Sequence, residues 1–147
     1  MKFKVTVTKD VIDRSLMCGV GGSGQIASNC AFAVLYTDLV PNVVVTGSEA
    51  AFYKNKRYYI GGYVVFDDQL QKVGLTEDQK DFIRKFDSRN SDIRPEGYGY
   101  YMDRYELVGQ EFDIEIPDAV IDYWYKDASE VAAKIANLRI SGHYRMV

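Results

Sequence analysis

Residues 111–117, EFDIEIP, decide the fold class. Phe112, Ile114 and Ile116 alternate strictly with charged residues, which is the period of a strand that buries one face. Beyond Pro117 the pattern changes, because apolar residues recur every three or four positions as far as Leu138. That spacing predicts a long amphipathic helix. The chain therefore combines strands and helices around one core, as α+β proteins do.

The start of this C-terminal helix carries two further signals. We expect Asp118 to cap its N-terminus and the helix to break near Asp127. Trp124 lies between Tyr123 and Tyr125, so one turn carries aromatic groups almost all the way round. A single buried stripe needs fewer apolar groups than this. We therefore expect self-association, a homo-oligomer formed through the C-terminal helix.

The earlier part of the chain alternates short strands and helices. In chain order we predict a strand at 2–8, a short helix capped by Thr8, a buried helix at 25–39, and strands at 43–45, 51–53 and 57–66 with a K-N-K turn at 54–56. Gly61-Gly62 predicts a bulge or a close backbone approach within the last of these strands. A helix opened by the capping box Thr76–Gln79, an exposed loop at 87–97, and strands at 98–102 and 106–116 follow. These elements predict one α+β domain over residues 1–138, an antiparallel sheet with helices packed mainly on one face. Residues 139–147 have no pattern, and we expect them to fray.

Charge and hydropathy exclude several classes of protein. The formal net charge is −3, and residues 61–147 hold 17 acidic but only 11 basic side chains. Duplex nucleic acids are bound mostly by clustered Lys and Arg, so we expect no broad nucleic-acid surface. No apolar run approaches the length of about 18 residues that crosses a bilayer, so we expect no membrane contact.

The glycine-rich stretch MCGVGGSGQIA at 17–27 contains G-x-G-x-x-G. In a dinucleotide-binding fold this motif follows a strand directly and an acidic residue ends the second strand. Here VIDRSLM separates strand and glycines, and the second strand ends at Thr46. We reject a dinucleotide site. Two interpretations stay open: a simple connection, or an anion-binding loop of Gly21, Gly22, Ser23 and Gly24 that offers backbone N–H groups.

Cysteine and histidine suggest no catalytic or metal site. Cys18 and Cys30 are the only cysteines and His143 is the only histidine, which is one ligand short of a closed zinc site. A Cys30 nucleophile would need an adjacent base, so we interpret it as a structural thiol. We expect no metal, no cofactor and a reducing, cytoplasmic compartment.

Two other groups of side chains are candidates for function. Asp113 and Glu115 share a strand face, where they are either paired catalytic carboxylates or a solvated surface. Tyrosines and arginines gather around residue 100, and these are the residue types of binding hot spots. The predicted contact site consists of Arg94, Tyr98, Tyr100 and Arg104.

The pattern as a whole resembles a group of small proteins encoded by tailed bacteriophages, for which no activity is established. The matching residues are Val5, Thr6, Ile12, Arg14, Cys30, Ala31, Ala33, Val43–Val45, Leu75, Phe82, Ile83, Phe86, Asp87, Arg94, Pro95, Phe112, Ile114, Ile116 and Pro117. The similarity covers roughly residues 3–117. This chain departs from the group at Ala31, where proline is usual, in the glycine-rich insertion at 19–24, and in the extension past Pro117.

On this resemblance we expect a phage accessory protein of the host cytoplasm that acts by binding. Its expected partner is a host protein, such as a defence protein that it counteracts, or a small nucleotide signal that it sequesters. The alternative is a small carboxylate-based hydrolase of phosphate esters or nucleotides. We favour the binding protein because no catalytic set of residues is complete.

Overall fold

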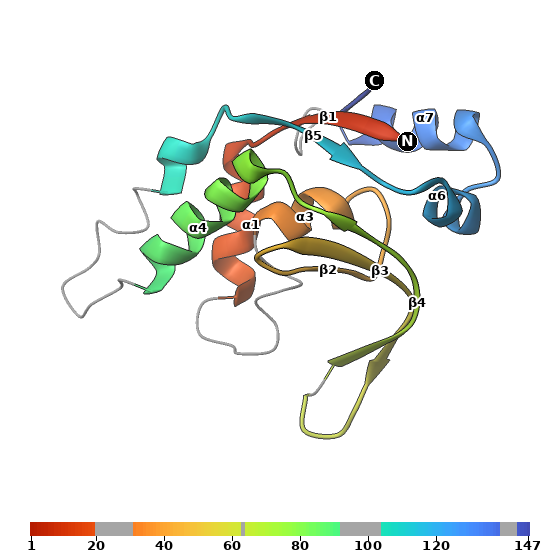
Figure 1. Cartoon of the computed structure of the whole chain (residues 1–147), viewed down its shortest axis with the longest axis horizontal. Coiled ribbons are helices and arrows are strands. Elements are labelled where there is room, and N and C mark those ends of the chain that lie inside the picture. The colour runs from red at the N-terminus through yellow and green to blue at the C-terminus, as the bar shows by residue number, and fades with distance from the viewer. Residues whose placement is uncertain (20–30, 63, 92–103, 139–143) are drawn as a thin grey trace.

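The computed structural model describes residues 1–19, 31–62, 64–91, 104–138 and 144–147. Within these residues the chain has the predicted α+β fold with antiparallel sheets (Figure 1). The elements are β1 (Lys2–Thr6), α1 (Lys9–Gly19), α3 (Ala31–Thr37), β2 (Val43–Val45), β3 (Glu49–Tyr58), β4 (Val64–Gly74), α4 (Glu77–Ser91), the 3₁₀ helix η1 (Arg104–Leu107), β5 (Glu111–Glu115), α6 (Asp118–Trp124), α7 (Ala128–Asn137) and β6 (Arg145–Met146).

The strands form two separate antiparallel sheets, whereas we expected one antiparallel sheet. The first has the order β5-β1-β6 and the second the order β2-β3-β4. In the first sheet Phe3 lies opposite Ile114 and Val5 opposite Phe112. All four side chains are buried, which confirms the alternation predicted for residues 111–117. The strand predicted over 106–116 is shorter, because η1 takes up residues 104–107.

Helix α3 lies between the two sheets and carries the centre of the core (Figure 1). Every residue from Ala31 to Tyr36 is buried. The Phe32 ring lies 5.4 Å from that of Phe112 on β5, and the Tyr36 ring lies 5.7 Å from that of Phe52 on β3. A helix that is apolar on all sides must be covered on all sides. The buried helix predicted for this region is confirmed from residue 31 onward, and residues 25–30 lie outside the described part.

Two helix starts follow the capping signals of the sequence. The Val11 N–H donates to Thr8 Oγ1 (3.3 Å) at the start of α1. At α4 the capping box is complete, because the Gln79 N–H donates to Thr76 Oγ1 (3.2 Å) and the Thr76 N–H donates to Gln79 Oε1 (3.0 Å). Helix α4 runs to Ser91, so residues 87–91 are not part of the loop predicted at 87–97, and residues 92–97 lie outside the described part.

The predicted K-N-K turn at 54–56 is wrong. These residues lie inside β3, and the chain reverses at 59–62 instead. Gly61 (φ 96°) and Gly62 (φ 85°) adopt the left-handed conformation that such a turn requires, so they are not the strand bulge that we expected. The register shift of the hairpin lies between Phe52 and Tyr53, where β4 has Leu70 as an extra residue.

The C-terminal helix is divided in two, as predicted near Asp127. The Asp127 carboxylate caps α7 by accepting the Glu130 N–H (3.0 Å). The predicted cap of the first half is wrong, because Pro117 occupies that position and makes no side-chain cap bond. Asp118 is the first helical residue, and its carboxylate lies 3.2 Å from the N-terminal amine of Met1.

Residues 144–147 belong to the fold, although we expected 139–147 to fray. Tyr144 is buried, and Arg145 and Met146 pair with Lys4 and Phe3 of β1 as strand β6. The Tyr144 hydroxyl lies 2.8 Å from the carbonyl of Leu35, which ties this end of the chain to α3. In the described part of the chain, no helix combines the length and apolarity needed to cross a bilayer.

Candidate functional site: a protruding β-hairpin

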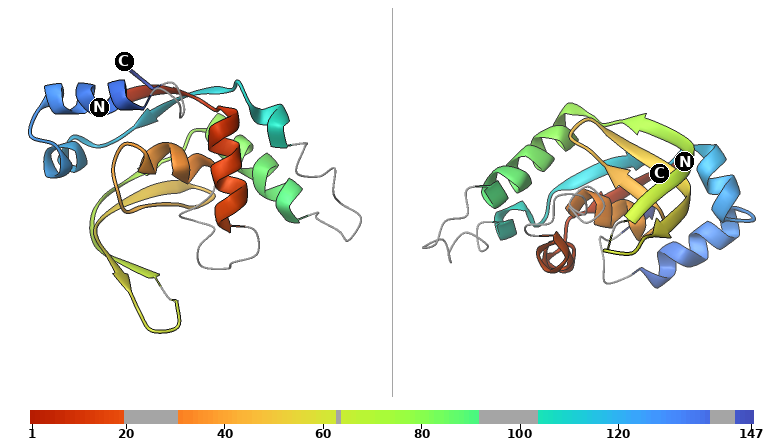
Figure 2. Two further views of the ribbon diagram at one scale, coloured as in Figure 1. Left: turned by 180° about the vertical axis from the view of Figure 1, so that it is seen from behind. Right: turned by 90° about the horizontal axis from the view of Figure 1, so that it is seen from below.

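The hairpin of β3 and β4 runs past the end of β2 and away from the helices. The view from behind shows the same projection (Figure 2). Strand β2 pairs with β3 only from Ala50 to Phe52, so the outer part of the hairpin is a two-stranded ribbon. We call residues 54–66 the β-arm; Tyr63 within it lies outside the described residues.

The root of the β-arm is held by side-chain bonds to the backbone and across the ribbon. Asn42 has φ 63°, and from this conformation its carbonyl accepts the Tyr53 N–H (3.0 Å) and its Nδ2 donates to the Lys54 carbonyl (3.0 Å). Asp68 also has a positive φ of 57°, and its carboxylate accepts a bond from Asn55 Nδ2 (2.6 Å). Left-handed backbone at a non-glycine residue costs energy, which these bonds offset. The ribbon therefore leaves the body in a defined direction.

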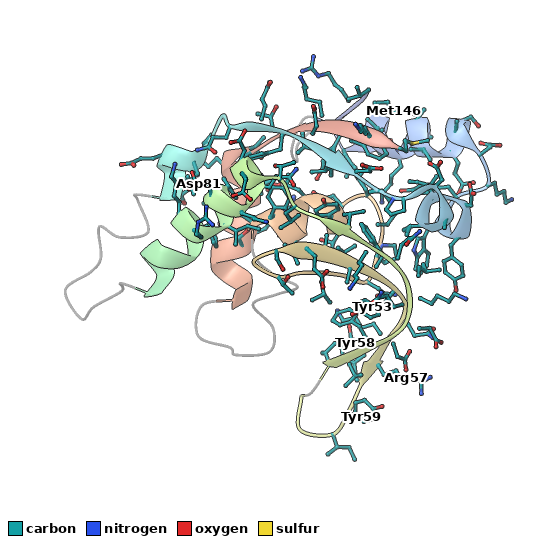
Figure 3. All side chains as sticks on the ribbon, viewed as in Figure 1. Tyr53, Arg57, Tyr58, Tyr59, Asp81 and Met146 are labelled. Carbon is teal, nitrogen blue, oxygen red and sulfur yellow. The ribbon has the colours of Figure 1, made fainter. Side chains whose placement is uncertain are left out.

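The tip of the β-arm exposes large apolar side chains. Exposed fractions are 73% for Tyr58, 52% for Tyr59, 103% for Ile60 and 42% for Val65. No charged residue occurs in the sequence from 58 to 66. A two-stranded ribbon has no core of its own in which these groups could be buried. Figure 3 shows Tyr58 and Tyr59 on this projecting part.

Cations lie just behind the tip. Lys56 Nζ lies 5.3 Å from the ring centre of Tyr58 and 5.7 Å from that of Phe66, while Lys54 Nζ lies 5.4 Å from the Tyr123 ring on α6. Among the described residues neither lysine has a carboxylate within 4.0 Å, whereas Arg57 pairs with Asp67 (2.8 Å). Lysines over aromatic faces are held in place without being neutralised. The β-arm thus presents an uncharged tip on a weakly basic stem.

The structure describes little of the contact site predicted from the sequence. Arg94, Tyr98 and Tyr100 lie outside the described residues, as do the loop Gly21, Gly22, Ser23 and Gly24, and also Cys30 and His143. Arg104 is the first residue of η1, and only its backbone is described. These assignments stay predictions.

The neighbouring Tyr105 is packed against the body of the protein. Its hydroxyl donates to Asp13 on α1, and Lys9 Nζ lies 5.6 Å from its ring centre. The hydrogen bond lowers the pKa of Asp13 and raises that of Tyr105. This half-buried tyrosine joins η1 to α1.

The paired carboxylates Asp113 and Glu115 lie on the exposed face of β5. Their cross-strand neighbours on β1 are Lys4 and Lys2, an arrangement of opposite charges that stabilises two adjacent strands. Asp113 also lines a hollow of about 340 Å³ with Gln79, but the Gln79 side chain is already bonded to the Asp113 carbonyl (2.8 Å) and to the cap of α4. The carboxylates thus lie on a solvent-exposed strand face opposite lysines, which fits the interpretation as a solvated surface.

No metal site is found in the parts of the chain that the structure describes, since no three His, Cys, Asp or Glu side chains gather there.

The aromatic turn of α6 is only partly exposed. Tyr123 has 47% of its surface free and stacks edge-on against Trp124 (4.8 Å between ring centres). Tyr125 is half-buried, and its hydroxyl donates to the carbonyl of Leu39, just beyond α3.

Comparisons of the chain with protein-family models, with curated proteins and with solved structures found no match. The resemblance to phage proteins therefore stays a prediction.

The β-arm was not predicted, because the turn of this hairpin was expected at 54–56 and lies at 59–62, about five residues later. The signal was present: Gly61-Gly62 between YYI and YVVF is a glycine pair between two strand-forming runs, the usual sign of a tight hairpin. A hairpin turn at Gly61-Gly62 would have placed Tyr58 to Ile60 at the tip.

Proposed function

We propose that this protein acts by binding another protein and that the β-arm is its contact surface. The observation that carries the proposal is the exposure of Tyr58, Tyr59 and Ile60 at the end of a ribbon that cannot bury them. Exposed apolar groups gathered in this way mark interaction sites in folded proteins. Tyrosine is also one of the residues that dominate binding energy in interfaces.

Charge favours a protein over a nucleic acid as the partner. The stem offers only two cations without a carboxylate partner, and the whole chain is acidic. Nucleic-acid affinity grows with the number of phosphates neutralised, so two lysines contribute little. Ile60 and Val65 have no π-face for stacking on bases, whereas they suit an apolar protein surface. In a phage-encoded chain, as the sequence resemblance suggests, the proteins that meet this surface would be host proteins or further copies of the chain itself.

The test is site-specific photocrosslinking in cells that produce the tagged protein. The photoreactive residue p-benzoylphenylalanine replaces Ile60 in one variant and Arg84, an exposed residue on α4, in the matched control. We expect the probe at 60 to form a discrete protein adduct, identified by mass spectrometry, that the probe at 84 does not form.

A competition experiment separates specific from random adducts. An excess of wild-type protein should suppress the adduct, while an equal excess of an Ile60→Ser, Tyr59→Ser double variant should not. Adducts at position 60 that are no more abundant than those at 84, or that both competitors suppress equally, would refute the β-arm as the contact surface.

A further inference from the structure

The β-arm has free strand edges as well as exposed side chains. Strand β3 has β2 on its outer edge only from Ala50 to Phe52, and in the described part of the chain no strand pairs with the outer edge of β4. An edge strand presents unpaired backbone N–H and C=O groups, which form a template for another strand. Proteins usually protect such edges with charges or a covering element, yet residues 64–66 carry no charge.

We propose that the β-arms of two copies of this chain pair edge to edge through β4, about a twofold axis at Val65. The inference rests on the proposed function, since it names the protein that occupies the β-arm as a second copy. The product is a four-stranded antiparallel ribbon with the order β3-β4-β4-β3. Ile60 and Tyr59 of each copy then lie against the ribbon of the other.

Charge decides which edge pairs. In a twofold contact each residue near the axis meets its own copy, so a charged residue there repels itself. On β3 the free edge holds Lys54, Lys56 and Arg57, and pairing through it would bring like charges together. On β4 the stretch 64–66 is neutral, and a register with Val65 opposite Val65 places Phe66 opposite Val64. The two copies of Asp67 are then separated along the strands and not opposed.

The exposed area is close to what a specific dimer needs. The exposed fractions of Tyr58, Tyr59, Ile60 and Val65, at roughly 150–250 Å² for each large side chain, amount to about 450 Å² per copy. Tyr58 and Val65 lie on opposite faces of the ribbon, because Tyr58 is opposite Val64 and Arg57 is opposite Val65. About 900 Å² for two copies is therefore the upper limit of what these side chains bury, and the paired backbones add to it; a specific interface needs on the order of 1,000 Å² or more. A second copy thus suits the surface in charge, and the available area is of the right order.

Cysteine crosslinking tests the register directly. Cys18 and Cys30 are replaced by Ser, and either Val65→Cys or the control Lys72→Cys, further along the same strand, is added. Residues opposite each other in antiparallel strands have Cα atoms about 4.5–5.5 Å apart, which a disulfide can bridge. The two copies of residue 72 would be about 45 Å apart at roughly 3.3 Å per residue. Under mild oxidation we expect Val65→Cys to form a disulfide dimer at least tenfold faster than Lys72→Cys.

If the cysteine-free background does not fold, Val65→Cys is made in the native chain and the 65–65 crosslink is identified by mass spectrometry. A charge variant supplies a second test by light scattering at tens of micromolar. Val65→Thr should stay dimeric, while Val65→Lys should be monomeric with an unchanged far-ultraviolet circular dichroism spectrum.

The outcomes distinguish this inference from the proposed function. Equal crosslinking rates at 65 and 72, or a dimer that Val65→Lys leaves intact, would overturn the twofold ribbon. A monomeric chain whose position 60 still crosslinks to a different protein would overturn the dimer and retain the binding function. No specific adduct from position 60, together with a monomeric chain, would overturn both.

Discussion

Asp38 joins three segments of the chain, and its replacement by Asn tests what holds the C-terminus to the core. Its carboxylate accepts Arg14 Nη1 (2.7 Å) and Nη2 (2.8 Å) from α1, and it lies 3.0 Å from the Tyr144 hydroxyl. The Asp38 side chain is 12% exposed and that of Arg14 is 36% exposed. The ion pair is thus shielded on one side only. Asp10 lies 3.0 Å from Arg14 Nε and raises the pKa of the guanidinium further, after Asp38 itself.

The magnitude follows from these contacts. Breaking a fully buried ion pair costs about 3–5 kcal/mol, because a buried charge loses its partner. Here Arg14 keeps Asp10 and partial contact with water, so we expect Asp38→Asn to lower the free energy of unfolding by about 2 kcal/mol. For a domain of this size that is a decrease in melting temperature of about 4–8 °C.

The assay is thermal and urea unfolding followed by circular dichroism. Asp81→Asn is the matched control, since Asp81 makes only exposed pairs, with Arg84 (3.6 Å) and Lys85 (3.0 Å) on α4, and its loss should change stability little. A double-mutant cycle with Tyr144→Phe should give a coupling energy above about 0.5 kcal/mol. The reasoning is refuted if Asp38→Asn is no more destabilising than Asp81→Asn, or if the two changes at 38 and 144 are additive.

Three other changes have defined outcomes. Phe32→Ala should cost about 3–5 kcal/mol in urea unfolding, because the ring is fully buried, while Phe32→Leu should cost under about 1.5 kcal/mol; equal losses would contradict the packing described. Thr76→Ala removes the acceptor for the Gln79 N–H and should cost about 1 kcal/mol in urea unfolding; an unchanged free energy of unfolding would show that the cap contributes nothing. Burial raises the pKa of Tyr144, with the Asp38 charge adding to the effect, so the protonated form is favoured in the folded state. The stabilisation by protonated Tyr144 is therefore complete below about pH 10 and is lost as the pH rises above the ordinary tyrosine pKa. Between about pH 10 and 12 the free energy of unfolding should fall less in Tyr144→Phe than in the wild type. If the free energies of the two proteins fall in parallel with pH, Tyr144 is not the group responsible.

Predictions that depended on a few neighbouring residues were confirmed. The alternation around Ile114, the capping box at Thr76 and the helix break near Asp127 all act within one strand or one helical turn, so the sequence contains the whole signal. The cap predicted at Asp118 was wrong for a local reason as well, since Pro117 lies before it and its fixed φ suits the residue that precedes a helix.

The β-arm could not be read in the same way. Lys54, Asn55 and Lys56 are polar enough for a turn, and they form a strand here because both faces of the ribbon meet water. Whether Tyr58 and Ile60 are buried depends on how far β2 follows β3, and β2 stops after three residues. No local pattern around Tyr58 and Ile60 encodes where β2 ends. The exposure of the tip is therefore a tertiary property.

The position of β1 in the middle of its sheet has a consequence for synthesis on the ribosome. Its two partners, β5 and β6, lie more than 100 residues later in the chain. Contacts this distant slow folding, because a long loop must close before they form. The β2-β3-β4 sheet involves only residues 43–74 and has all its strands long before β5 is made. During translation β1 must wait unpaired, with Phe3 and Val5 open to chaperones, while the hairpin that carries the β-arm can already be complete.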